Sequence, residues 1–321
     1  MNSIFDPTLL LQITCHDPDE FQKVAIGWDI DHVQLVPGNY RINVDMIHTR
    51  NIQFSNITHC IGVQERGCIP PGACAISLPT LLSTYPLYCC GRILQRDECL
   101  ASMPGDEFET FSNGGINYFT IVVDIDLLNK EAVRLTGHPF SSLVRSQRVT
   151  IKKQDQLRLV HTMSTMIQEL THYPHHLTTG KQELLEKQIV EQILLSIRPP
   201  SGKKIKNPNR LQAASKAEQL IRQHPRQHLN IQQLCSLIGC STRTLHLGFK
   251  ERYGTTPGHY ARTLALNAVW RQFRSQPQSR TVTEVAMAWG FYHLGRFSSQ
   301  YRQLFDELPS VTVKRCRGGR A

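Results

Sequence analysis

The sequence lacks an apolar segment long enough to cross a membrane, and it lacks a basic N-terminal region. No stretch approaches the ~18 consecutive apolar residues that a spanning helix requires. The first basic residue is Lys23, and four acidic residues precede it, which is the wrong polarity for a signal peptide. We therefore expect no membrane contact and a cytoplasmic location.

The usual spacings of metal ligands are also missing. The ten cysteines include no C-x-x-C pair, although Cys89 and Cys90 are adjacent. Without a secretory signal we expect most of them to be reduced, small buried hydrophobic side chains, with a redox or metal role as the alternative. His48 and His59 have no second histidine two residues away, which argues against a metal-dependent enzyme of the cupin type. We predict neither catalysis nor a cofactor.

Charge is distributed unevenly along the chain. Residues 203–321 contain 20 Lys and Arg against 5 Asp and Glu, a net charge of +15, whereas residues 1–202 contain 16 against 21, a net charge of −5. Such a basic segment is typical of one that faces a polyanion. Because 40% of the residues are apolar, both parts can bury a core.

Residues 21–123 are predicted to form β structure. Short apolar runs alternate with turns such as Pro37-Gly38 and Asn113-Gly114-Gly115. The segment 118–123 is rich in β-branched and aromatic residues. Many short strands with regularly spaced turns favour a small barrel or sandwich.

The segment 124–197 is predicted to be mainly helical. Asp126 is expected to cap a helix that ends at Thr136, with Gly137 just beyond its last turn.

Two longer helical patterns follow, at 157–170 and 184–197, where apolar residues recur with the spacing of one helix face. We expect these helices to fold back on each other and to pair two subunits; the alternative is that both stripes pack on their own barrel. Between them, His172, His175 and His176 are interpreted as a surface turn rather than as a metal site.

A linker is predicted at 198–210, which contains three prolines, one glycine and five basic residues. The predicted domains are therefore a sensor and oligomerisation domain at 1–197 and a DNA-binding domain at 211–321.

The C-terminal part contains two helix–turn–helix patterns. In the first, the apolar residues of 231–238 share a face, a tight turn follows at 239–241, and Ser241 is placed to cap a helix over 242–252. The second repeats this design, with a helix over 282–289, a turn at Gly290-Phe291 and a helix over 293–305. A helix of this kind fits the major groove of DNA, where its N-terminal half reaches base edges.

The second pattern closely resembles the signature of AraC/XylS-type bacterial transcription regulators, in the run Gly290-Phe-Tyr-His-Leu-Gly-Arg-Phe-Ser-Ser-Gln-Tyr-Arg-Gln-Leu-Phe-Asp-Glu-Leu-Pro-Ser310. The first pattern matches through Ser241-x-Arg243-x-Leu245, Phe249-Lys250 and Tyr253-Gly254-x-x-Pro257. The resemblance covers roughly residues 211–312. Many members have a glycine where Asp306 stands.

The resemblance implies an α+β protein with two parts. The C-terminal part would be an all-α domain of seven helices, in which a linker helix at about 260–274 holds the two recognition helices in successive major grooves. The N-terminal part would be a cupin-like β barrel, at about 21–123, that binds an effector and is followed by a helical hairpin.

The resemblance also assigns DNA contacts to the two recognition helices, with Ser241 at the start of the first. The residues expected to read bases are Thr242, Arg243, His246, Leu247, His293, Leu294, Ser298 and Ser299. The residues expected to bind phosphates are Lys250, Arg296 and Arg302.

The function implied is that of a sequence-specific DNA-binding transcription regulator, a promoter activator or dual regulator. Its expected partners are double-stranded promoter DNA, RNA polymerase, a second copy of the chain and an unknown effector, in the cytoplasm and associated with the nucleoid. Two alternatives stay open: a cupin-type metal-dependent enzyme fused to a DNA-binding tether, and an architectural DNA-binding protein without sequence preference.

Overall fold

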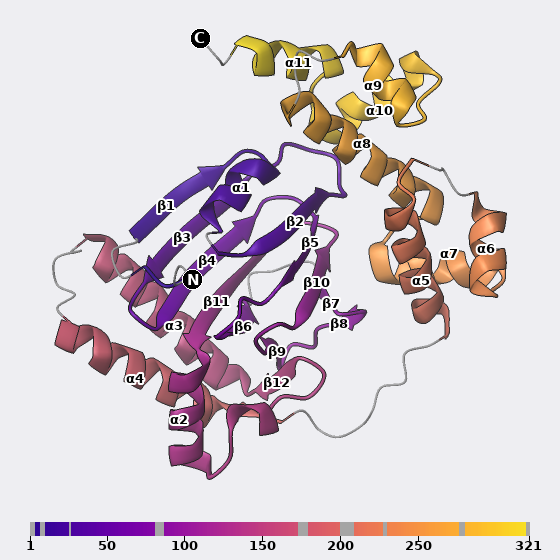
Figure 1. Cartoon of the computed structure of the whole chain (residues 1–321). Coiled ribbons are helices and arrows are strands. Elements are labelled where there is room, and N and C mark those ends of the chain that lie inside the picture. The colour runs from indigo at the N-terminus through magenta and orange to yellow at the C-terminus, as the bar shows by residue number, and fades with distance from the viewer. Residues whose placement is uncertain are drawn as a thin grey trace.

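The architecture is α+β, as predicted, with antiparallel sheets followed by a helical region (Figure 1). Within the described residues no helix is both long and apolar enough to span a bilayer. The computed structural model describes residues 4–6, 10–25, 27–80, 87–172, 179–199, 209–226, 230–275 and 280–318.

The described strands form two antiparallel sheets, which we call together the β domain. The larger sheet has the order β1 (Leu10–Cys15), β3 (Ile42–His48), β4 (Ile52–His59), β11 (Ile116–Asp124), β6 (Ala73–Pro79), β9 (Glu98–Ser102), β12 (Arg148–Ile151) and β13 (Ile197–Arg198). The smaller sheet has the order β2 (Asp29–Gln34), β5 (Val63–Cys68), β10 (Glu107–Ser112), β7 (Leu87–Cys89) and β8 (Arg92–Ile93). The helices of this part are α1 (Pro18–Val24), α2 (Ile125–Thr136), the short 3-10 helix η1 (Phe140–Ser142), α3 (Lys153–His172) and α4 (Thr179–Ser196).

Successive side chains of a strand point to opposite sides of the sheet, and both sides of strand β4 in the larger sheet are covered. In β4, Ile52 and Phe54 pack with helices α2, α3 and α4 in one core. Between them Gln53, and after them Ser55 and Ile57, line a cavity that the smaller sheet closes from the other side. One face of the larger sheet therefore packs against helices, and the other face lines the cavity between the two sheets.

The predicted β segment 21–123 is too short. β1 begins at Leu10, and β12 and β13 come after α2, so strands from both sides of that range join the larger sheet. Residues 21–24 are helical instead, because Asp17 caps α1 and Pro18 occupies its first turn.

Asp124, and not Asp126, caps α2. Its carboxylate accepts hydrogen bonds from the backbone N–H groups of Asp126 and Leu127. The reason is that β11 continues to Asp124, so the strand leads directly into the helix. The predicted end is confirmed, since the helix stops at Thr136 and Gly137 has a left-handed φ of 75°.

The two predicted apolar helices exist as α3 and α4, which contact each other. Their stripes are buried against the larger sheet, with Leu159, Met163 and Ile193 in the same core as the strands. The stripes therefore do not provide the surface from which pairing of two subunits was inferred. Of the three histidines interpreted as a surface turn, His172 is the exposed last residue of α3, whereas His175 and His176 lie outside the described residues.

From residue 209 onward the described chain has the seven helices that the resemblance implies. The two predicted helix–turn–helix units are confirmed, although α10 begins one residue after His293, which occupies its N-cap position. Ordered structure also extends into both ends of the predicted linker, because Arg198 belongs to β13 and α5 begins at Asn209. The helices are α5 (Asn209–Gln223), α6 (Ile231–Ile238), α7 (Thr242–Tyr253), α8 (Pro257–Ser275), α9 (Val282–Ala288), α10 (Leu294–Phe305) and α11 (Pro309–Gly318).

All ten cysteines are free thiols, but only four are buried, so the expectation that most are buried is wrong. Burial raises the pKa of the Cys15 thiol to about 11. By contrast, a hydrogen bond from Cys89 lowers the pKa of Cys90 to about 7. The buried cysteines are Cys15, Cys74, Cys89 and Cys99.

The end of α10 generates a stability prediction. Asp306 has a φ of 58°, in the left-handed region. Glycine, which has no Cβ, adopts this conformation freely, whereas residues with a side chain are strained there. We expect Asp306→Gly to raise the free energy of unfolding by about 0.5–1 kcal/mol, measured as the midpoint of thermal or urea unfolding. The matched control is Gly239→Ala at the left-handed end of α6, which should cost about 1 kcal/mol. A lower midpoint for Asp306→Gly would contradict the prediction.

Candidate DNA-binding surface

The sequence around α7 favours a helix with one buried face. The Ser241 hydroxyl accepts a hydrogen bond from the backbone N–H of Thr244, which confirms the predicted cap. Leu245, Phe249 and Tyr253, spaced four residues apart, are buried in one core with α5 and α6. The opposite face of α7 is consequently turned to solvent.

Helix α10 has the same construction. Phe297, Tyr301 and Leu304 are buried in a second core with α8, α9 and α11. The Tyr301 hydroxyl shares a hydrogen bond of 2.8 Å with the Thr312 hydroxyl, which ties α10 to α11. Helix α8 contributes to both cores, so one rigid element joins the two units.

Of the twelve predicted DNA-contacting residues, two are half-buried, Leu294 and Ser298. Lys250 also donates a hydrogen bond of 3.1 Å to the backbone carbonyl of Gly254. The assignment of all twelve to DNA stays a prediction. The ten that are exposed are Ser241, Thr242, Arg243, His246, Leu247, Lys250, His293, Arg296, Ser299 and Arg302.

The structure adds two residues to this surface that the sequence analysis missed. Tyr292, in the turn before α10, is 73% exposed. With Arg262 of α8 it lines a small hollow of about 190 Å³ beside His293 and Arg296. The signal in the sequence was a tyrosine directly before the start of a recognition helix; its exposure and the proximity of Arg262 depend on tertiary packing.

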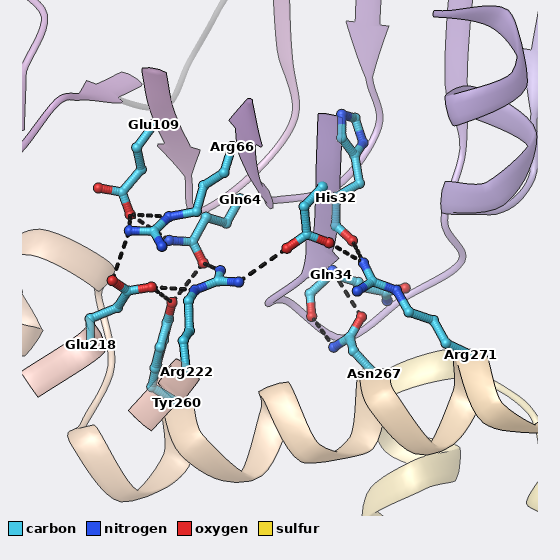
Figure 2. Close-up of polar contacts among 11 residues, drawn as sticks. His32, Gln34, Gln64, Arg66, Glu109, Glu218, Arg222, Tyr260, Asn267 and Arg271 are labelled. Carbon is cyan, nitrogen blue, oxygen red and sulfur yellow. Dashed lines mark hydrogen bonds and ion pairs between the residues drawn. The ribbon is translucent and has the colours of Figure 1, made fainter. Parts of the chain in front are cut away.

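The helical domain docks on the smaller sheet of the β domain. Figure 2 shows the polar part of this contact. The side-chain amide of Asn267 on α8 donates to the backbone carbonyl of Gln34 at 2.9 Å and accepts from its backbone N–H at 3.1 Å. Beside it, Arg271 donates to the Asp31 carboxylate at 2.6 Å and to the backbone carbonyl of His32. Helix α8 therefore lies along strand β2.

A second polar group ties α5 and α8 to strand β5. Arg222 donates to the Gln64 amide oxygen at 2.7 Å and to Asp31 at 3.0 Å. The fully buried Glu218 accepts hydrogen bonds from Arg66 at 2.8 Å and from the Tyr260 hydroxyl at 3.1 Å. Each charged group of this cluster faces an opposite charge, which offsets the cost of removing it from water.

Apolar contacts complete the docked surface. Val33, Leu35 and Phe111 of the β domain share one core with Phe249 and Tyr253 of α7. The rings of Phe111 and Tyr253 lie 6.0 Å apart. The inner face of the first recognition helix is therefore packed partly by the β domain.

Docking explains part of the uneven charge. Arginines of the basic half pair with carboxylates of the acidic half at Asp31, at Asp17 and Asp19 through Arg274, and at Glu109. Facing a polyanion is therefore not what all of the positive charge in residues 203–321 does. Some of the positive charge holds the two halves of the chain together.

A cavity of about 90 Å³ lies between the two sheets. On one side of it a buried carboxylate, Glu65, contacts four polar groups. His32 Nε2 lies 2.7 Å and His59 Nε2 3.6 Å from Oε1 of Glu65, and the hydroxyls of Tyr118 and Thr110 donate to this carboxylate at 3.1 and 2.9 Å. His59 has no second histidine two residues away in the sequence, but the fold places both a histidine and a carboxylate beside it. Five strands, β2, β4, β5, β10 and β11, bring these residues together.

The charge states in this cluster follow from burial and from the neighbours. Burial by itself would raise the pKa of Glu65, but the nearby His59 and His32 outweigh it and hold the pKa at about 2. Burial lowers the pKa of His59 to about 4. At neutral pH the cluster thus keeps an ionised carboxylate beside a neutral His59. Among the described residues no group of three or more His, Cys, Asp or Glu side chains is arranged to hold a metal ion.

Comparison with known proteins identifies the helical domain. Residues 234–315 match the family of helix-turn-helix domains. A xylDLEGF operon transcriptional activator of Pseudomonas putida is 37% identical over 101 residues, which are 31% of this chain and 31% of that protein. Another, xylDLEGF operon transcriptional activator 2 of the same organism, is 41% identical over 97 residues, or 30% of this chain and 61% of that protein. The C-terminal domain belongs to the AraC/XylS family.

One similar chain has a solved structure. A probable AraC family transcriptional regulator from Rhodopseudomonas palustris is 30% identical, covering 33% of this chain and 97% of that one with a TM-score of 0.32. The chain spans about a third of the length of the first Pseudomonas putida relative. The matches therefore concern the AraC/XylS-type domain and not the whole protein.

Docking of the AraC/XylS-type domain should depend on pH. Burial would raise the pKa of Asp31, but the guanidinium groups of Arg271 and Arg222 outweigh it and hold the pKa below its ordinary value. The contribution of Asp31 to docking is therefore complete above the ordinary carboxyl pKa and is lost as the pH falls through the lowered one. We expect Asp31→Asn to increase the radius of gyration in X-ray scattering at pH 7.

The control for this prediction is Asp29→Asn, at an exposed position of the same strand. It should leave the radius of gyration unchanged. Equal compactness of the Asp31→Asn and parent proteins at pH 7 would show that the ion pairs of Asp31 do not hold the domains together.

Proposed function

We propose that this protein is a sequence-specific DNA-binding transcription regulator, a promoter activator or dual regulator. The observation that carries this proposal is the pair of recognition helices, α7 and α10, whose outer faces are exposed in an AraC/XylS-type domain and which α8 joins rigidly. Curated relatives of this domain are transcriptional activators. Promoter DNA is the proposed main partner.

The exposed side chains divide into two proposed roles. Arg243 and His246 stand in the N-terminal half of α7, the part of a recognition helix that reaches base edges. Lys250, Arg296 and Arg302 would bind phosphates, which position a protein on the duplex without reading its sequence. Tyr292 and Arg262 would extend the phosphate-binding surface next to α10.

The proposal includes the remaining partners of the sequence analysis. RNA polymerase would be recruited at the promoter, in the cytoplasm and near the nucleoid, by a domain at 211–321 tethered through 198–210 to a sensor domain at 1–197. Pairing of two subunits would use the outer side of α4, where Leu184 and Leu195 lie three turns apart and are 58% and 63% exposed.

The cavity between the sheets is the proposed effector site. Its wall is mainly apolar and aromatic, with Phe21, Trp28 and Phe108, and it includes the ionised Glu65. A negatively charged ligand would be repelled there, so we propose an effector that is compact, largely apolar and uncharged or cationic. The imidazoles of His32 and His59 contact Glu65. Because they pair with this carboxylate, we propose that the cavity binds a ligand and does not catalyse a reaction.

The DNA-binding proposal predicts a bipartite motif. Selection of bound fragments from a random DNA pool at near-physiological salt should enrich two half-elements about ten base pairs apart, one turn of the duplex. Arg243→Ala should relax the preference in one half-element by about 1–3 kcal/mol, because a bidentate base contact is worth that much. Lys250→Ala should weaken binding to all sequences equally.

The control is Lys216→Ala, an exposed position of α5 outside both recognition helices, which should not change the motif. Binding without any enriched motif would contradict sequence-specific regulation and favour the architectural alternative.

The effector proposal predicts an unusual response to Ser102→Ala. The Ser102 hydroxyl is buried in the cavity wall and has no hydrogen-bond partner. Its removal should stabilise the effector-free protein by about 1 kcal/mol, since a buried unsatisfied hydroxyl carries a desolvation penalty of that order. The measurement is the thermal unfolding midpoint.

Ser112→Ala serves as the control because its hydroxyl lines the same cavity but donates to the Gly114 carbonyl at 2.9 Å. It should destabilise the protein by about 1 kcal/mol. If Ser102→Ala destabilised the protein as much, the Ser102 hydroxyl would have a partner and would not be available to an effector.

A further inference from the structure

Two adjacent thiols lie at the edge of the docked surface, at the end of β7. The Sγ atoms of Cys89 and Cys90 are 3.7 Å apart. Both are free thiols, since sulfurs in a disulfide lie about 2.05 Å apart. Cys89 is buried and Cys90 is half-buried, so the pair can be reached from one side.

The separation of the two sulfurs suits a shared third atom. Two thiolate bonds of about 2.3 Å, as to zinc, meeting at a tetrahedral angle place their sulfurs roughly 3.8 Å apart. The pair can therefore bind both sides of one thiophilic centre with little movement. Because the pair offers only two sulfur atoms, it suits a centre that bonds to two protein thiolates.

The surroundings of the pair are unusual in two ways. Among the described residues, three of the four non-glycine residues with positive φ gather here: Cys90 at 45°, Ser146 at 51° and Gln147 at 59°. The Cys90 thiol donates to the side-chain oxygen of Gln147 at 2.8 Å. Strain of this kind concentrates at functional sites.

The second unusual neighbour is a buried guanidinium. Arg148 is 3% exposed and donates to the backbone carbonyl of Cys89. Its Nε makes no hydrogen bond, although the Glu98 carboxylate lies 3.9 Å away. For Cys90, the hydrogen bond from Cys89 and, to a smaller extent, the Arg148 charge lower the pKa of the thiol, whereas the hydrogen bond to Cys90 and burial outweigh that charge at Cys89 and raise its pKa.

We propose that Cys89 and Cys90 form a dithiol site for one thiophilic centre, a trivalent metalloid compound that bonds two sulfurs. With an organoarsenic oxide, both S–H bonds break, two As–S bonds form, and the oxygen leaves as water with the two protons. No electrons are transferred, so the step needs no oxidant.

The site adjoins the first recognition helix. The backbone N–H of Cys90 donates to the carbonyl of Glu109 at 2.8 Å, and the Glu109 carboxylate accepts a hydrogen bond from Arg252 of α7. A Cβ atom at Gly91 would lie 2.6 Å from the guanidinium of Arg252. Occupation of the thiols is thus expected to displace Arg252 and to change DNA binding, a consequence that rests on the proposed function.

The test treats the full-length protein with phenylarsine oxide and measures its intact mass. We expect one adduct per chain, with the mass of the probe less one water, that survives excess monothiol and is released by a small dithiol. Cys90→Ser should abolish this adduct. Cys60→Ser, which removes an exposed thiol, and Cys240→Ser should both retain it.

An adduct that persists in Cys90→Ser, or one that monothiol removes, would overturn the proposal. Because Cys89 is buried and its serine variant can fail to fold, Cys90→Ser and Cys90→Ala, with unchanged thermal midpoints, decide the result. DNA affinity is then compared with and without probe. An adduct without any change in affinity would overturn the link to α7 but not the site, whereas failure of the untreated protein to select a DNA motif would count only against the proposed function.

Discussion

The contact between strand β2 and helix α8 is the constraint on which the arrangement of this protein depends. Neighbouring residues of a strand point to opposite faces. Asp31 therefore reaches out to Arg271 of α8, while His32 reaches in to Glu65 at the cavity. Here strand β2 alone therefore lies between the proposed effector site and the docked AraC/XylS-type domain. The same alternation in β5 places Arg66 outside and Glu65 inside.

The arginines of the basic C-terminal half fall into two groups with different roles. Arginines such as Arg222, Arg252 and Arg274 neutralise carboxylates of the β domain. Those on the outer faces of the recognition helices, such as Arg243 and Arg296, are exposed. Because the first group is buried or half-buried between the domains, net charge alone overstates how much of the basic half is available to DNA.

The recognition helices were predictable because their determinants are local. Ser241 caps α7, and Leu245 and Phe249 are spaced four residues apart, so the sequence indicates both the start of the helix and its buried face. The capping of α2 was mispredicted by two residues, because Asp124 and Asp126 are both acceptable caps and only the end of β11 decides between them. Local patterns therefore predict which elements exist better than where they begin.

The sequence by itself determined the α+β class, the two helix–turn–helix units and the family of the C-terminal domain, since these follow from helical periodicity, capping residues and a contiguous motif. Only the tertiary structure decided that His32, His59 and Glu65 meet beside a cavity and that α8 docks on β2. His59 and Glu65 are six residues apart but lie on strands of different sheets, and the residues that join α8 to β2, Asn267 and Gln34, are 233 residues apart. Their meeting depends on strand order and packing, which leave no spacing pattern in the sequence.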